Sequence, residues 1–185
     1  MPGTTYAVSS DLTGEAYAAA LAIWGEFEQR YGLTAARAAI HPHVTYVVGD
    51  CERPEVLSEH LAIIASTIAP FAVELEGVGV FERPQPVVHL RVAKSTELLS
   101  AFAAISAAMQ AAGLRLWPYY APGIWTPHVT LALQDTSPAL LPALLADLAA
   151  RCTHFTTRLE AAGLVHVLQP QHAYVGTFPF GGTAT

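Results

Sequence analysis

The spacing of apolar residues along the chain predicts four helices. In each of four segments an apolar residue recurs every three or four positions, which is the period of one face of a helix. The four apolar faces consist of Tyr17, Leu21, Trp24 and Tyr31; of Leu57, Leu61, Ile64 and Ile68; of Leu98, Phe102, Ile105 and Met109; and of Leu141, Leu145, Leu148 and Cys152. Gly32 and Gly113 would end the first and third helices in a left-handed conformation. Pro142 requires the fourth helix to begin near Leu141.

Strands are predicted between these helices, where β-branched and aromatic residues gather. The predicted strands are residues 6–9, 43–48, 71–80, 87–93, 128–133, 155–167 and 173–178. Helices and strands therefore mix along the whole chain. This order predicts an α+β protein in which each sheet buries one face under its helices and leaves the other face open.

The pattern repeats once along the chain. His43-Val44-Thr45 recurs as His128-Val129-Thr130, 85 positions later, and each copy follows a proline. Further matches accompany it, at the same offset or one residue less: Asp50 with Asp135, Phe71 with Phe155, Leu75 with Leu159, and Gly79 with Gly163. The repeat spans about 5–80 and 87–167. It predicts one domain, residues 1–185, built from two intertwined lobes related by a pseudo-twofold axis, with two antiparallel sheets facing a central cleft.

The repeated triplet has a clear chemical use. Successive side chains of a strand point to opposite faces, so each copy presents one imidazole beside one hydroxyl. Two such strands across a cleft would form a cage of His43, Thr45, His128 and Thr130. Two histidines can serve as acid and base near neutral pH, and two threonines can donate hydrogen bonds to an anion. The anion that this cage fits is a phosphoryl group.

Composition and charge limit the kinds of binding partner that the protein can have. The chain has 185 residues, 52% of them hydrophobic, and a net charge of −6 with only nine lysines and arginines. A long nucleic-acid duplex needs a basic surface, so a small nucleotide or one RNA end is expected instead. No apolar run is long enough to span a bilayer and no secretory signal is visible, which predicts a cytoplasmic protein. Nothing in the sequence requires more than a monomer.

These features resemble the 2H phosphoesterase superfamily, and within it the bacterial 2′-5′ RNA ligase and cyclic phosphodiesterase branch. The resemblance is carried by TTYAVSSDL, HPHVTYVV, GVGVFERPQPVVHLRV, TPHVTLAL and YVGTFPF. It implies chemistry without a metal or cofactor on 2′,3′-cyclic or 2′,5′-linked phosphates of a nucleotide or RNA 3′ end. His43 and His128 would be catalytic, with His128 as base and His43 as acid, and Thr45 and Thr130 would bind phosphate.

Substrate contacts are expected near the second triplet. Tyr119, Tyr120 and Trp125 precede it and could stack on a base, or they could pack at the rim. Phe81 and Arg83 lie in a loop of the first half. Arg83 could bind phosphate as a forked donor, or it could be a solvated loop residue.

Three alternatives remain open. The same residues could run the reaction as 2′-5′ ligation, or the cage could bind nucleotides or RNA ends without catalysis. A metal site of His41, His43 and His128 is the third, although the second triplet has no histidine two positions before it. The remaining histidines have no matched partners and are expected to be structural: His60, His89, His154, His166 and His172.

Overall fold

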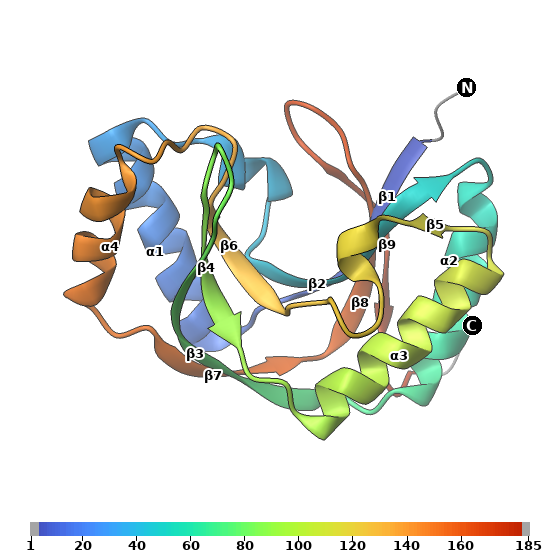
Figure 1. Cartoon of the computed structure of the whole chain (residues 1–185). Helices are drawn as coiled ribbons and strands as arrows, with labels where there is room; N and C mark the ends of the chain where they lie inside the picture. The colour runs from blue at the N-terminus through green and yellow to red at the C-terminus, as the bar shows by residue number, and fades with distance from the viewer. Residues whose placement is uncertain (1–3, 183–185) are drawn as a thin grey trace.

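The structure is a computed structural model that describes residues 4–182 and forms two antiparallel sheets flanked by helices (Figure 1). The first sheet has the strand order β5-β2-β1-β8-β9 and the second has the order β6-β4-β3-β7. The first sheet consists of β1 (Thr4–Asp11), β2 (His43–Cys51), β5 (Arg115–Leu116), β8 (Ala161–His166) and β9 (Ala173–Pro179). The second consists of β3 (Phe71–Phe81), β4 (Val87–Val92), β6 (His128–Ala132) and β7 (His154–Leu159). The predicted α+β class with two antiparallel sheets is confirmed.

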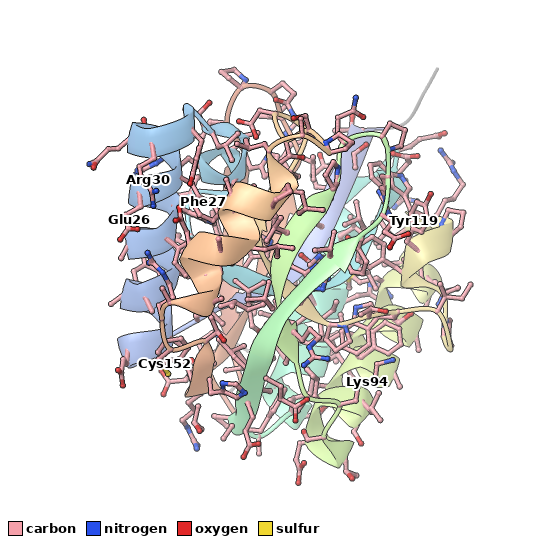
Figure 2. The ribbon with its side chains drawn as sticks, turned by 60° about the vertical axis from the view of Figure 1, so that its left-hand side comes forward. Glu26, Phe27, Arg30, Lys94, Tyr119 and Cys152 are labelled. Carbon is pink, nitrogen blue, oxygen red and sulfur yellow. The ribbon has the colours of Figure 1, made fainter. Side chains whose placement is uncertain are left out.

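Two pairs of helices lie on opposite sides of the molecule in Figure 1. The helices are α1 (Gly14–Tyr31), α2 (Pro54–Thr67), α3 (Thr96–Ala111) and α4 (Leu141–Ala149), with short 3₁₀ turns η1 (Ala35–Ala39) and η2 (Pro118–Tyr120). Helix α1 contacts β6 and β7 of the second sheet, while α2 and α3 contact strands of the first. An ion pair of Arg30 with Asp147 joins α1 to α4, and Glu26 of α1 pairs with Arg151, which lies just after α4. Figure 2 shows Glu26, Phe27 and Arg30 on α1.

The predicted helix boundaries are largely confirmed. Gly32 follows α1 with a φ of 71°, and its N–H donates to the carbonyls of the last turn. The Ser95 hydroxyl caps α3 by accepting a hydrogen bond from the Leu98 N–H. Helix α4 begins at Leu141, which places Pro142 in the first turn, where a missing N–H costs little.

The prediction of one strand over residues 155–167 is wrong. The segment forms two strands, and the chain leaves the second sheet after Leu159 and enters the first sheet at Ala161. Burial follows this change, because β7 alternates between exposed and buried positions, whereas most of β8 is buried. Only Glu160 lies between the two strands, and their hydrogen-bonding partners differ: β7 pairs with β3, and β8 pairs with β1 and β9.

The two halves exchange elements between the sheets. Strand β3 comes from the first half but lies in the second sheet, and β8 comes from the second half but lies in the first. Where β3 pairs with β7, Phe71 opposes Leu159 and Leu75 opposes Phe155. These are the residues matched by the repeat, and each opposes the counterpart of the other, as expected beside a pseudo-twofold axis.

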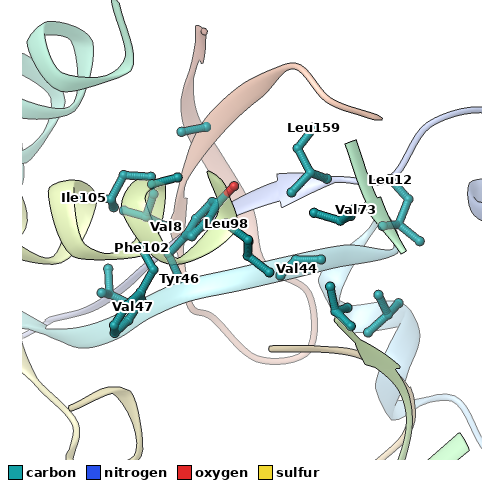
Figure 3. Close-up of a cluster of buried hydrophobic side chains, with 14 of the residues drawn as sticks. Val8, Leu12, Val44, Tyr46, Val47, Val73, Leu98, Phe102, Ile105 and Leu159 are labelled. Carbon is teal, nitrogen blue, oxygen red and sulfur yellow. The ribbon is translucent and has the colours of Figure 1, made fainter. Parts of the chain in front are cut away.

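One large core lies between the helices and the outer faces of the sheets. Figure 3 shows part of it, where Val8, Val44 and Tyr46 of the first sheet lie beside side chains of α3 such as Leu98 and Ile105. The buried Tyr46 hydroxyl shares a hydrogen bond with Ser10 of β1 at 2.9 Å, so its polar group is satisfied. This packing fixes the positions of β1 and β2, whose other face lines the cleft.

Candidate active site

Each His-Val-Thr triplet opens a strand. His43 is the first residue of β2 and His128 is the first residue of β6, each directly after a proline. Val44 and Val129 are fully buried in the core. Because neighbouring side chains of a strand alternate, the histidines and threonines lie on the opposite, half-buried side and line the cleft.

Both imidazoles are held in the same way by their own backbone. Nδ1 of His43 lies 2.9 Å from the carbonyl oxygen of His41, and Nδ1 of His128 lies 2.8 Å from that of Thr126. A carbonyl oxygen can only accept, so Nδ1 carries the hydrogen in each neutral ring. Nε2 then has a free lone pair, and both rings present the nitrogen suited to proton transfer.

Two tryptophans hold the threonines from the opposite halves of the chain. The indole N–H of Trp24, on α1, donates to the Thr130 carbonyl at 3.0 Å. The indole N–H of Trp125 donates to the Thr45 carbonyl, also at 3.0 Å. The first half therefore supports the second triplet, and the second half supports the first. Trp24 was predicted only as part of an apolar helix face, since nothing in the sequence pairs it with Trp125.

The cleft has two compartments that meet at the threonines. Thr45 and Thr130 line both, together with Trp117, Tyr120, Leu133 and Gln134. His43 lines only the compartment over the first sheet, with a volume of about 240 Å³. His128 lines only the second compartment, beside the β3–β4 hairpin, with a volume of about 1100 Å³. We call these the His43 compartment and the His128 compartment.

The predicted substrate residues all lie at the His128 compartment. Tyr119 is 60% exposed, and the Arg83 guanidinium lies 4.6 Å from the centre of its ring. Burial raises the pKa of the Tyr120 hydroxyl to about 12. Trp125 is only 3% exposed and stacks flat on Phe102 of α3, with ring centroids 4.1 Å apart. One face of its ring is therefore already covered.

His89, which was predicted to be structural, lies beside the site. It is buried in β4 opposite Thr130, and its ring is 5.2 Å from that of His128. Phe81 stacks on His89 at 4.2 Å and meets His128 edge-on at 4.9 Å. Gly79 makes room for this ring, because a Cβ there would come within 2.4 Å of His89 Nε2. The matched glycines were the only sequence signal of this packing.

The surroundings of the two catalytic candidates differ in charge. Burial holds the pKa of His43 below its ordinary value; the His41 carbonyl and the Asp11 carboxylate act against burial, and the His172 and His41 imidazoles lower the pKa further. The pKa of His128 is lowered to about 4, chiefly by burial and also by His89, His43 and Arg83, while the Thr126 carbonyl acts in the opposite direction. Asp11 opposes His43 across β1 and β2 and accepts a hydrogen bond from the Tyr174 hydroxyl at 2.6 Å. A carboxylate therefore acts on the pKa of His43, whereas the charged groups that act on the pKa of His128 are His89, His43 and Arg83.

The alternative metal site does not form. Within residues 4–182, no three His, Cys, Asp or Glu side chains are grouped so that they could hold a metal ion. His41 instead shares a hydrogen bond through Nδ1 with the Tyr17 hydroxyl at 2.9 Å. Among the same residues, no helix is both long enough and apolar enough to cross a membrane.

The two antiparallel sheets, which face a shared cleft, have the fold of the 2H phosphoesterase class of proteins. The chain belongs to the 2′-5′ RNA ligase superfamily, whose family model matches residues 16–169. Members of this superfamily are phosphoesterases or ligases. The resemblance inferred from the sequence is thus confirmed.

Solved structures show the same fold at low sequence identity. TT0787 of Thermus thermophilus aligns with a TM-score of 0.66 and 18% identity, over 97% of this chain and 99% of that one. E. coli LigT in complex with 3′-AMP aligns with a TM-score of 0.66 and 16% identity, over the same shares. Usb1 of Kluyveromyces marxianus with uridine monophosphate has a TM-score of 0.51 and 12% identity, over 96% and 99%. No curated protein sequence matches the chain.

Proposed function

We propose that the protein is a metal-independent phosphoesterase. Its substrate would be a 2′,3′-cyclic phosphate or a 2′,5′-phosphodiester of a nucleotide or RNA end. The observation that supports this proposal is the pair of imidazoles. Each lies within hydrogen-bond distance of a carbonyl through Nδ1, and each lines one of two compartments that meet at Thr45 and Thr130. The nucleotides bound by LigT and Usb1 support a nucleotide as the partner.

Hydrolysis of a cyclic phosphate would use one imidazole on each side of phosphorus. His128 takes a proton from water, and the water oxygen bonds to phosphorus. The bond from phosphorus to one ribose oxygen breaks, and His43 gives its proton to that oxygen. Thr45 and Thr130 donate hydrogen bonds to the nonbridging oxygens, whose charge grows in the transition state. Each acid or base of this kind contributes about 10²- to 10⁴-fold.

The charge asymmetry of the cleft supports this division of roles. A general base must be neutral, and the low pKa of His128 keeps its ring neutral. A general acid must carry a proton; burial lowers the pKa of His43, and the Asp11 carboxylate opposes this lowering and favours the protonated form. By microscopic reversibility, the same residues would exchange roles if the reaction ran as ligation. The wide His128 compartment, lined by Trp117, Tyr119 and Tyr120, could hold a second nucleoside for that direction.

The proposal is tested with the four nucleoside 2′,3′-cyclic monophosphates. The purified protein is treated with excess EDTA, and the 2′- and 3′-phosphate products are resolved by chromatography. We expect turnover that EDTA leaves unchanged and a single product isomer, because a fixed acid protonates only one ribose oxygen. Turnover that is lost with EDTA and restored by a divalent cation would contradict the proposal.

A further inference from the structure

The His43 compartment, the smaller of the two, has a mostly apolar lining that differs from that of the His128 compartment. We infer that the His43 compartment is a nucleoside site, and that it holds the nucleobase of the nucleotide whose ribose oxygen leaves phosphorus. This inference rests on the proposed function and assigns to it a base-binding surface that the sequence did not indicate. Of the side chains expected from the sequence to stack on a base or bind around it, only Tyr120 lines this compartment, and it lines the other one as well.

The His43 compartment has an apolar floor and an apolar wall. Its floor is the small buried cluster of Ala7, Val48 and Val165 on the open face of the first sheet. Its wall is the 3₁₀ turn η1, which contributes four alanines, namely Ala35, Ala36, Ala38 and Ala39. A flat ring between these two surfaces would exchange water for apolar contact on both faces.

The alanine wall is fixed in place from both sides. The Asp135 carboxylate accepts hydrogen bonds from the N–H groups of Thr34 and Ala35, at 2.6 and 2.8 Å. On the other side the His172 N–H donates to the Ala38 carbonyl at 2.8 Å. The compartment is therefore formed before any ligand binds, which reduces the entropy lost on binding.

The absence of Asp, Glu, Lys and Arg from the lining of the His43 compartment, among residues 4–182, favours a ligand group without charge. The polar groups of the compartment include Ser9, Gln134 and Gln169, which can pair with the edge of a base. The His128 compartment, by contrast, is lined by Glu82 and Arg83. A volume of about 240 Å³ is below the roughly 300 Å³ at which pockets for drug-sized ligands begin, and suits one base.

The geometry of the reaction places the ribose on the same side. In an in-line displacement the attacking and leaving oxygens lie on opposite sides of phosphorus. His43 protonates the leaving ribose oxygen, so the nucleoside extends from the phosphate into the compartment that His43 lines. Water reaches phosphorus from the wider compartment, where His128 can deprotonate it.

Binding measurements that need no turnover test this inference. Ala35 and Ala38 are half-buried, so leucine at either position adds atoms to the compartment rather than to the core. Calorimetric titration with adenosine 3′-phosphate and, separately, with inorganic phosphate compares Ala35→Leu and Ala38→Leu with the unchanged protein. We expect each variant to weaken nucleotide binding at least tenfold and to leave phosphate binding unchanged. Ala18→Leu, at an exposed position on α1, should change neither.

Three outcomes would overturn the inference. Unchanged nucleotide affinity in both η1 variants would show that the base does not lie there, and a loss confined to Tyr119→Ala would place it in the His128 compartment. An equal loss for nucleotide and phosphate would show that η1 acts on the histidine and threonine cage instead. A different result bears on the proposed function alone. If the nucleotide binds as expected but no cyclic nucleotide is hydrolysed, the proposed catalysis is refuted and the nucleoside site remains.

Discussion

At the scale of single residues, the site depends on how each ring is held. The carbonyls of His41 and Thr126 set the tautomers, and the charged neighbours set the protonation. A bound phosphate is an anion, and it would raise both histidine pKa values from those of the empty cleft. The pH dependence of kcat/KM reports the free protein and therefore reads the empty-cleft values.

Activity should be highest on the acid side of neutrality. The value of kcat/KM should rise through the pKa of His128, about 4, as the base loses its proton. It should fall through the pKa of His43, which lies below the ordinary 6.5, as the acid loses its proton. Asp11→Asn removes a carboxylate that raises the His43 pKa, so the alkaline limb should move to lower pH while the acid limb stays. A shift of the acid limb alone would contradict the assignment of the alkaline limb to His43.

Trp125 can be tested as a support rather than a substrate contact. Trp125→Phe keeps an aromatic ring against Phe102 but removes the N–H that bonds the Thr45 carbonyl. We expect kcat to fall several-fold and KM for cyclic nucleotides to stay the same. The unfolding free energy should fall by about 1–3 kcal/mol, because a carbonyl loses its partner. A rise in KM with unchanged kcat would instead show direct contact with substrate.

The sequence predicted the inward-facing histidines and threonines because the strand period alone determines which face they occupy. It did not predict His89 or Trp24, since their roles depend on neighbours that are distant along the chain. His89 faces Gly79 across β3 and β4, and Trp24 of helix α1 donates to the Thr130 carbonyl of strand β6. Contacts of this kind leave no periodic signal.

At the scale of elements, a close approach between β3 and β4 holds His89 against His128. A Cβ on Gly79 would lie 2.4 Å from His89 Nε2, and the packed Phe81 and His128 rings leave little room for the ring to move. The spacing of these two strands therefore controls the position of His89 beside His128, the proposed general base.

Gly79→Ala should displace His89 and disturb His128. We expect kcat to fall by about 10- to 100-fold, the range that small displacements of catalytic groups can produce. Gly25→Ala is the control, because a Cβ there would meet only Arg37 Nη2, at 3.6 Å, within helix α1. It should keep full activity and gain about 0.5–1 kcal/mol of stability from the better helix former. Equal activity of both variants in a cyclic nucleotide assay would contradict this role of Gly79.

The elements themselves were mostly predictable, because helix faces and strands have distinct periods. The exception was the segment over residues 155–167, whose two strands belong to different sheets. Local sequence does not encode a change of sheet, since the hydrogen bonds that define it are made with distant strands. The same limit applies to α1, which comes from the first half but packs on β6 and β7 of the second.

At the scale of the whole molecule, the two halves are linked at several levels. Strands β3 and β8 change sheets, and the indoles of Trp24 and Trp125 cross from one half to the triplet of the other. This exchange favours the interpretation of the chain as one domain with two intertwined lobes. Neither half would complete its cage alone, so the site would exist only when both lobes are folded.

The most direct test of the paired-histidine account compares His43→Ala, His128→Ala and the double variant with the unchanged protein. The readout is hydrolysis of a nucleoside 2′,3′-cyclic phosphate in EDTA, with circular dichroism as the check of folding. We expect each single variant to lose about 10²- to 10⁴-fold in kcat and the double variant to lose little more, because the two residues act as a unit. A folded double variant with the activity of the unchanged protein would contradict the account.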